Sequence, residues 1–299
     1  MTYKMYMMDF QSAHFGSGKL DTGSLTFSAD RLFSALVLEA IKADKLDDFL
    51  ELANRKSFVL SDAFPFKGAP FLPKPIGYPS PDKLPQDLDV QEMRQQAKKS
   101  KKLNYVSLSD FENFLNGHSL EAKVFAKSSL VTKNQPLKEG GLFQVGTKTY
   151  EKDSKLYVIA EQSQLFDLLM TGLQYSGIGG KRSSGYGRFD LEIHDLPSDL
   201  ARKLTQSFDR GVMLLTSSLP MDEDLEAAMT ESHYLLSKSS GFAFSTNEAS
   251  NYRKQDLYKF KAGSTFSETF RGQIVDVRPK GFPHPVLNFA KPLFYKLEV

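Results

Sequence analysis

The stretch from Ser176 to Arg188 most constrains how this chain can fold, because it concentrates glycine between two segments of different periodicity. It follows an amphipathic segment, residues 162–174, and runs into an alternating one, residues 188–194. Glycine at this density ends a helix and lets the main chain adopt positive φ angles. The pattern therefore predicts a helix that ends in a glycine loop, followed directly by a strand.

The same loop has the composition of a phosphate-binding site. Consecutive N–H groups of a glycine loop can converge on an anion, and Lys181, Arg182 and Arg188 add positive charge. Tyr186 offers a face for stacking. Neither G-x-x-x-x-G-K-[ST] nor G-x-G-x-x-G can be drawn through these residues, which argues against an ATPase or a dinucleotide-binding enzyme. The alternative is a mobile surface turn without a ligand.

The charge balance limits how a nucleic-acid surface could be built. The 299 residues include 38 basic and 36 acidic side chains, so such a surface would be a local patch. The chain has no cysteine, which excludes disulfides, thiolate nucleophiles and zinc sites with sulfur ligands, and agrees with a reducing cytoplasm. The sequence shows no signal peptide and no apolar span of membrane length, so we expect a cytoplasmic protein without membrane contact.

Hydrophobic periodicity predicts the elements of the first two hundred residues. We expect strands over residues 3–10, 58–66, 155–160 and 188–194, and helices over residues 28–41, 44–54 and 162–174. A polar glycine loop, residues 11–23, separates the first strand from the first helix. Strand, helix, strand, strand, helix, strand is the ferredoxin-like order.

An insertion interrupts this order. It opens with a segment, residues 65–85, too rich in proline for regular structure. It continues with helices over residues 91–103 and 109–115 and an arm rich in hairpins, with a strand at residues 142–145. The first helix ends in Lys98, Lys99, Lys101 and Lys102, which we interpret as solvated charges that complement the helix dipole.

The pattern begins again near Phe208. We expect a strand over residues 212–218, a helix over residues 222–236, and extended segments near residues 241–245, 257–260, 266–277 and 293–297. The prediction is therefore an α+β fold with two tandem ferredoxin-like (RRM-like) domains. The first would span residues 1–200, with a hairpin and helix arm inserted at about residues 65–150, and the second residues 201–299.

A ferredoxin-like domain whose last helix enters the loop Gly177-x-Gly-Gly-Lys-Arg-x-x-Gly-x-Gly-Arg188 resembles the RAMP superfamily of CRISPR RNA-binding proteins. Further segments resemble one branch, the subunit that caps the 5′ end of the guide RNA in type III-A (Csm) effector complexes. These segments are Phe27 to Phe33, Val131 to Asn134, Gly141 to Phe143, Leu236 to Phe242, Ala262 to Ser264, His284 to Val286, and Lys291-Pro292.

The resemblance implies a non-catalytic subunit that needs no cofactor and no metal. It would hold the repeat-derived 5′ tag of the CRISPR RNA, dock the large polymerase-like subunit and abut the first backbone RAMP subunit, and it would meet target RNA only indirectly. In this family the glycine loop and the first strand-to-helix connection bind the tag. A hairpin thumb from the insertion kinks the RNA at the boundary between tag and guide.

The candidate RNA-binding residues lie in these segments and combine cations, glycine amides, hydroxyls and rings. They are His14, Phe15, Gly16, Ser17 and Lys19 after the first strand, Arg31 in the first helix, Lys133 and Asn134 in the arm, and Gly177, Gly179, Gly180, Lys181, Arg182, Ser183, Ser184, Tyr186 and Arg188 in the glycine loop.

We expect specific roles for several of these residues. The cations would meet phosphates, and the amides of Gly179 and Gly180 would add donors. Tyr186 or Phe15 would stack on a base, although Tyr186 could equally be a core residue. Arg31 lies in the first turn of a helix, where a cation opposes the dipole, so a bound phosphate would explain it.

Two other functions remain open. His14 could be the general acid or base of a RAMP-type, metal-independent endoribonuclease that processes CRISPR RNA. The chain could also be a scaffold whose glycine loop packs against protein; salt would then affect binding little. His194 and Asp195 have no further ligands at suitable spacing, so we predict no metal site there.

Overall fold

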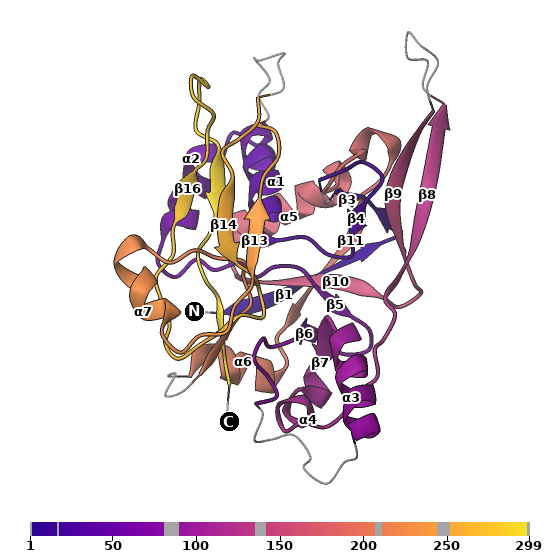
Figure 1. The fold of residues 1–299 in the computed structure, drawn as a ribbon. Helices are drawn as coiled ribbons and strands as arrows, with labels where there is room; N and C mark the ends of the chain where they lie inside the picture. Colours follow the sequence, from indigo (N-terminus) through magenta and orange to yellow (C-terminus); the bar gives the residue numbers. More distant parts are fainter. Residues whose placement is uncertain are drawn as a thin grey trace.

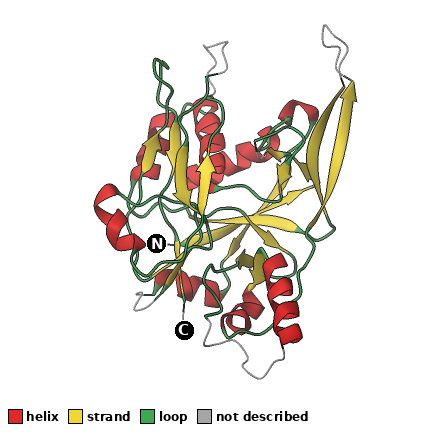
Figure 2. Ribbon diagram, in the orientation of Figure 1, coloured by secondary structure: helices red, strands yellow, loops and turns green. Residues whose placement is uncertain are grey.

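The computed structural model describes residues 2–16, 18–80, 90–134, 142–206, 211–243 and 252–297. Small antiparallel sheets and short helices make up the described part, as Figures 1 and 2 show. The fold class is α+β, as predicted. None of the described helices has the length and apolar character that a membrane crossing requires.

The largest sheet joins strands that are far apart in the chain. β1 (Tyr3–Phe10) lies between β11 (Phe189–Asp195) and β10 (Lys155–Glu161), and β5 (Phe64–Phe66) pairs with the other side of β10. All these pairs are antiparallel. Ranked by their order along the chain, the four neighbouring strands β11, β1, β10 and β5 are the fourth, first, third and second strands of this sheet. This is the order of a ferredoxin-like sheet.

Two helices, α1 (Ala29–Lys42) and α5 (Gln164–Ser176), cover one face of this sheet, and α2 (Leu46–Asn54) packs on α1. α5 begins at a good N-cap, because the Ser163 hydroxyl accepts the N–H of Phe166 at 3.1 Å. The apolar side chains of all three helices join one core with alternate residues of β1 and β10.

The opposite face of the same sheet is buried as well. Met5 and Met7 of β1 and Tyr157 of β10 pack into a second core, together with side chains of the insertion and of the C-terminal half. Met213 and Tyr295 belong to that core. Because both faces are covered, only the edges and loops of this sheet are open to a ligand.

The insertion combines small pairs of elements with one long hairpin. β6 (Phe71–Pro73) pairs with β7 (Tyr105–Ser107), and α3 (Val90–Lys102) and α4 (Phe111–Leu115) lie beside them. The prediction that the proline-rich segment lacks regular structure is wrong, because it contains part of β5 and all of β6. Both strands have three residues and lie at sheet edges, where proline costs little.

The long hairpin is the arm: β8 (Ala126–Asn134) and β9 (Leu142–Tyr150), which project from the body in Figure 1. Its paired strands extend well beyond the predicted residues 142–145. Residues 135–141, including Gly141 of the resemblance, lie outside the described residues. β2 (Ser12–Ala13) pairs with β9 at the foot of the arm.

The C-terminal half contains smaller sheets. Its described strands are β12 (Val212–Leu214), between β15 (Thr265–Phe266) and β18 (Phe294–Lys296), and two hairpin-like pairs, β13 (Leu236–Ser239) with β14 (Leu257–Phe260) and β16 (Ile274–Asp276) with β17 (Leu287–Phe289). α6 (Ser198–Thr205) precedes them and packs on β18.

The helix predicted over residues 222–236 is wrong in length. A 3-10 turn, Asp222–Asp224, leads into α7 (Leu225–Met229), and the chain then turns through Glu231 at φ 49°. The Asp224 carboxylate holds Arg271 through three hydrogen bonds, from Nε at 2.9 Å, from Nη2 at 2.8 Å and from the backbone N–H at 2.8 Å. Tertiary contacts therefore determine where the helix in this segment ends, and helical periodicity alone predicts a helix that is too long.

Candidate RNA interface

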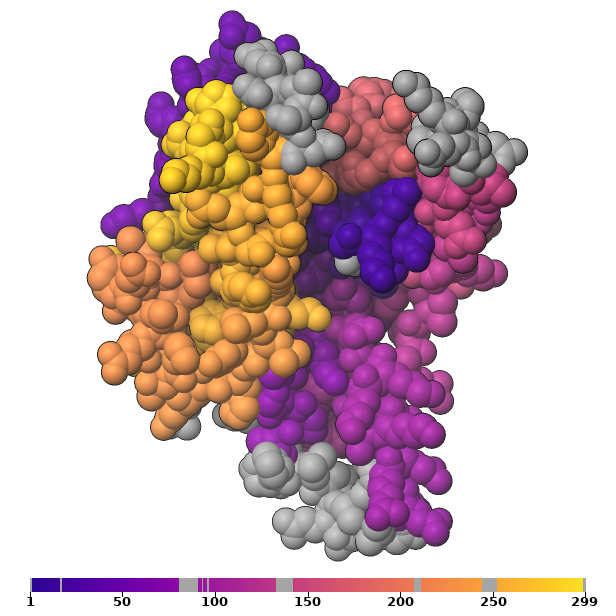
Figure 3. Space-filling view, turned by 45° about the horizontal axis from the view of Figure 1, so that its top comes forward, coloured from indigo at the N-terminus to yellow at the C-terminus, as the bar shows by residue number. Residues whose placement is uncertain are grey.

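A hollow lies on one face of the molecule, between the C-terminal half and the arm (Figure 3). Its floor is the segment that follows β1, drawn in indigo, and the end of α5 and the arm rise beside it. The floor contains β3 (Phe15–Gly16) and β4 (Gly23–Ser24), which pair with each other. The polar loop predicted for residues 11–23 is therefore a paired and partly buried segment.

The glycine loop is fixed to this floor by its own backbone. The N–H of Gly180 donates to the carbonyl of His14 at 2.9 Å. A Cβ atom at Gly179 would lie 2.7 Å from the same carbonyl oxygen, and one at Gly187 would lie 2.0 Å from the carbonyl oxygen of Ile178. Positions 179 and 187, at φ 100° and 80°, therefore need glycine for close main-chain packing.

This packing corrects one predicted role. The N–H of Gly180 is already bound to His14, so the expectation that it meets a phosphate is wrong. Gly177 ends α5 at φ 73°, and its N–H donates to Leu173 at 2.7 Å. The glycines mainly allow the loop to lie close to neighbouring backbone, and the loop's cations remain the candidates for ligand contact.

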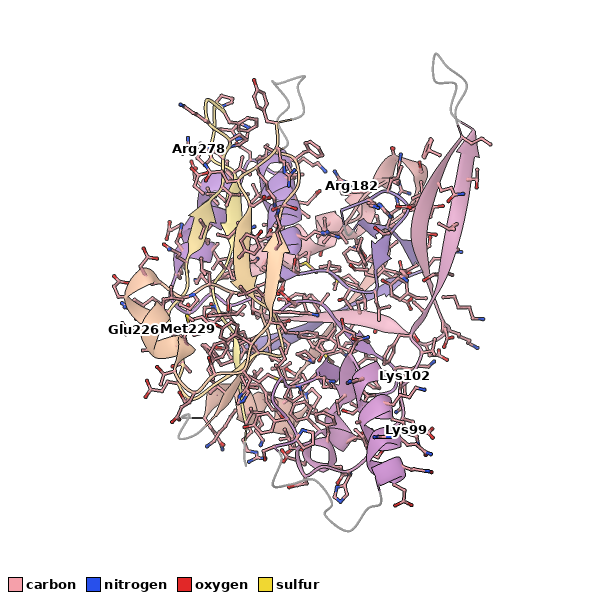
Figure 4. The ribbon with its side chains drawn as sticks, viewed as in Figure 1. Lys99, Lys102, Arg182, Glu226, Met229 and Arg278 are labelled. Carbon is pink, nitrogen blue, oxygen red and sulfur yellow. The ribbon has the colours of Figure 1, made fainter. Side chains whose placement is uncertain are left out.

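The cations of the loop differ in their contacts and exposure. Lys181 has a left-handed backbone at φ 58°, and its ammonium lies 4.5 Å from the ring centroid of Phe143 on β9. Arg182 follows and is half-buried; Figure 4 shows it between the arm and the C-terminal half. Arg188 is exposed and Tyr186 is half-buried. The structure thus brings the predicted cations together on one short loop.

The hydroxyls of the loop accompany these cations. Ser183 and Ser184 are exposed and lie in the 3-10 turn Arg182–Ser184. Lys19 is exposed on the floor segment, and Ser17 lies outside the described residues. Lys133 and Asn134 end β8, so they lie toward the tip of the arm.

His14 links the loop to the arm. Its ring is 5% exposed, and Nδ1 lies 2.7 Å from the carbonyl oxygen of Gly146 on β9, so Nδ1 carries a proton that it donates. The other side of the ring packs against Gly180, where a Cβ atom would lie 2.7 Å from Cδ2. His14 therefore holds the floor segment, the glycine loop and the arm together.

The predicted stacking role of Phe15 is wrong. Its ring is completely buried and packs at 5.6 Å from Phe10 and 4.9 Å from Phe27, between ring centroids. The carbonyl of the next residue, Gly16, accepts a hydrogen bond from Arg31 Nη2 at 2.8 Å. Burial lowers the pKa of Arg31. Arg31 thus supports the floor from behind, and no base can reach Phe15.

A buried charge network that the sequence did not predict lies behind the floor. Asp30 contacts Lys259 at 3.1 Å and accepts the Ser239 hydroxyl at 2.7 Å and the Asn288 amide at 3.1 Å. Burial alone would raise the pKa of Asp30, but the Lys259 ammonium and the hydroxyl of Ser28 hold it below its ordinary value. This network joins α1 to the C-terminal half.

Asp62 makes a second connection between the halves. Its carboxylate accepts the N–H of Ala29 at 2.8 Å, which caps α1, and the hydroxyl of Ser217 at 2.6 Å. Burial raises the pKa of Asp62. Two segments that carried the resemblance, Phe27 to Phe33 and Leu236 to Phe242, therefore meet in these networks. The sequence signal that could have revealed these networks is an aspartate that stands alone in an apolar segment, as Asp30 and Asp62 both do.

No group of three or more metal-ligating side chains occurs in the part of the chain that the structure describes. His194 lies 3.1 Å from Glu192, and the Asp195 carboxylate binds Lys4 at 2.7 Å. Both contacts are on the exposed end of β11.

Comparison with known proteins gives a consistent result. A family model described as the CRISPR Csm4 C-terminal domain matches residues 209–297. The CRISPR system Cms protein Csm4 of Streptococcus thermophilus is 60% identical over 299 residues, which are 100% of both chains. The protein of the same description from Mycobacterium tuberculosis H37Rv is 34% identical over 313 residues, covering 99% of this chain and 98% of the relative.

Solved structures have a similar fold. One is the crystal structure of a Csm3-Csm4 subcomplex in the type III-A CRISPR-Cas interference complex, with a TM-score of 0.67, 18% identity and coverage of 99% of this chain and 100% of that one. Another is a Csm1-Csm4 cassette in complex with AMPPNP, with a TM-score of 0.64, 15% identity and coverage of 100% and 99%.

Proposed function

The chain belongs to the Csm4 family, and we propose on this premise that it binds the 5′ tag of the CRISPR RNA as a non-catalytic subunit of a type III-A effector complex. The observation that carries the proposal is the glycine loop, which is fixed by backbone contacts to the floor of a hollow and contributes Lys181, Arg182 and Arg188, none of them fully buried.

The geometry favours a single RNA strand over a duplex or a small molecule. Both faces of the central sheet are buried, so the strand would follow the floor and the loop at its edge. Cations along a groove bind the backbone of single-stranded RNA, and a fixed loop loses little conformational entropy on binding. Tyr186 is the remaining candidate for base stacking.

Partners follow from the relatives. Csm4 proteins occur with Csm3 in one similar structure and with Csm1 in another. We therefore propose that this chain contacts a large polymerase-like subunit and a backbone RAMP subunit, and that it meets target RNA only through the assembly. The exposed strands of the C-terminal half and the arm offer separate surfaces for the two partners.

The surroundings of His14 favour a non-catalytic role. A general acid or base must reach the reacting hydroxyl or leaving group, but the His14 ring is 5% exposed and its Nδ1 is bound to Gly146. The ring would have to leave the arm and the glycine loop before it could act on RNA. The endoribonuclease alternative therefore requires the interface itself to open.

Binding of labelled guide RNA, with and without its 5′ tag, tests the proposal at two salt concentrations in EDTA. The proposal predicts binding that depends on the tag, weakens steeply with salt and leaves the RNA intact. Metal-independent cleavage that is lost in His14→Ala would establish the endoribonuclease instead. Absence of RNA binding by the purified chain and by its assembly would favour a protein scaffold.

A further inference from the structure

The opposite side of the arm from the glycine loop has a second cationic surface. A hollow of about 240 Å³ lies between the end of α3, the segment that leads into β8, and β9. Lys102, Lys123 and Lys148 line it, and no aspartate or glutamate of the described residues does. Figure 4 shows Lys99 and Lys102 on α3 below the foot of the arm, and Arg182 above it.

Strand alternation separates this hollow from the glycine loop. Phe143, which lies under the Lys181 ammonium, and Lys148 are five positions apart on β9, so their side chains leave opposite faces of the strand. Ala126, which also lines the hollow, pairs with Tyr150 and shares the face of Lys148. One face of the arm therefore contacts the glycine loop, and the other borders the lysine hollow.

The three lysines have no carboxylate partners among the described residues. Lys148 donates to the Ser128 hydroxyl, and Lys123 lies 5.2 Å from the ring centroid of Phe71. The Lys102 ammonium has no hydrogen bond or ion pair within the part of the chain that the structure describes. Nearby Lys67, by contrast, is paired with Glu151 at 2.8 Å. Like charges that converge without a counter-charge favour a bound anion.

The helix dipole explains only part of this arrangement. Lysines in the last turn of α3 complement the negative end of that helix, and this accounts for Lys99, Lys101 and Lys102. It does not account for Lys123 and Lys148, which come from two other segments and line the same hollow. The convergence of three elements marks a site formed by the fold.

We propose that this hollow binds a phosphate of the same RNA strand after the strand has passed the arm, an inference that rests on the proposed function. Its volume is below the roughly 300 Å³ of the smallest typical ligand pockets, so it would hold about one nucleotide unit. Lysine acts as a point charge without fixed geometry. The hydroxyl of Tyr105 is already bound to Thr26 at 2.9 Å. The contact therefore adds affinity without reading the base.

Two RNAs and a variant in which the three lysines of the hollow are neutralised test this inference. The variant combines Lys102→Gln, Lys123→Gln and Lys148→Gln; the control combines Lys45→Gln, Lys56→Gln and Lys280→Gln, three exposed lysines away from the arm. One RNA covers only the tag, and the other continues into the guide. We expect the variant to bind the short RNA with unchanged affinity. It should bind the long RNA at least roughly tenfold more weakly, because the hollow loses up to three charge-assisted contacts.

The salt dependence gives a second readout. The slope of log K against log salt should fall by about 0.7, the value for one neutralised phosphate, for the long RNA alone. The same affinity and slope as the control would overturn the inference and leave the proposed function intact. Failure of the wild-type chain to bind either RNA would overturn both. Retained RNA binding with weakened association of a partner subunit would assign the hollow to an acidic protein surface instead.

Discussion

The glycine loop and the segment after β1 have similar compositions but opposite roles. Both contain glycines, hydroxyls and cations, and both were predicted to contact RNA. In the glycine loop the main chain packs on the protein, the Lys181 ammonium lies over the Phe143 ring, and Arg182 is half-buried between the arm and the C-terminal half. In the segment after β1 the rings of His14 and Phe15 are buried. Composition marks both segments as candidate ligand loops, but only packing shows which atoms remain available.

The largest expected effect concerns the buried charge network of Asp30, which lies behind the floor of the hollow. Asp30→Asn leaves the Lys259 ammonium buried without its counter-charge, and we expect a loss of about 3 to 5 kcal/mol in the free energy of unfolding at neutral pH. Denaturant titration would measure it. Because the pKa of Asp30 is lowered in the folded chain, its contribution is complete above the ordinary value of 3.8 and is lost as the pH falls through the lower folded value.

The control for this pH dependence is the difference between wild type and Asp30→Asn at each pH. That difference should be constant above about pH 5 and shrink in more acidic solution. A difference that grows as the pH falls would contradict the assignment of Asp30 as a buried carboxylate that lysine stabilises.

Phe15→Ala separates a core ring from a stacking ring. The Phe15 side chain is fully buried, so we expect a loss of about 3 to 5 kcal/mol in stability and no change in RNA affinity once the folded fraction is corrected for. Tyr186→Ala is the matched comparison: a smaller loss of stability and weaker RNA binding. Weaker RNA binding by Phe15→Ala at unchanged stability would reverse the contrast between the two segments.

The glycines of the loop can be tested in a pair. Gly187→Ala places a Cβ atom 2.0 Å from a carbonyl oxygen at φ 80°, and should cost about 3 kcal/mol from the left-handed backbone and local strain together. Gly185→Ala has a similar φ, 88°, but no atom within 4 Å, and should cost about 1 to 2 kcal/mol. Equal thermal shifts in the two variants would show that close backbone packing does not explain the glycines.

A smaller effect is expected from His14→Gln. The hydrogen bond to Gly146 contributes about 1 kcal/mol, so local opening of the arm should become roughly fivefold more frequent. Hydrogen exchange of the β9 amides would detect this, and His118→Gln, at an exposed histidine, is the control. Unchanged exchange in β9 would mean that other contacts position the arm.

Much of the structure of residues 1–200 could be predicted from sequence, because several of its elements are long and strongly periodic. The helices that became α1 and α5 and the alternating strand β11 carry clear 3.6- and 2-residue patterns. The shorter elements failed: residues 222–236 follow helical spacing, but the ion pair of Arg271 with Asp224 and the turn at Glu231 limit α7 to five residues. Long-range contacts of this kind leave no local pattern.

The candidate site was predictable to the same degree. The cations of the glycine loop are local in sequence, and the structure keeps them together. The burial of Phe15 and the bond between His14 and Gly146 depend on residues more than a hundred positions away or on the closing of the core, so no spacing rule could show them. The lysine hollow, formed by three separate segments, was hidden for the same reason.

The most direct test of the account is the affinity of the double variant Lys181→Gln and Arg182→Gln for RNA that carries the 5′ tag, compared with Lys45→Gln and Lys56→Gln. If each charge contributes about 1.5 to 3 kcal/mol, the double variant should bind at least a hundredfold more weakly. Its salt slope should be about 1.4 lower, while its thermal unfolding stays close to that of the control. Wild-type affinity and an unchanged slope in a folded double variant would contradict the assignment of the glycine loop as the RNA-binding element.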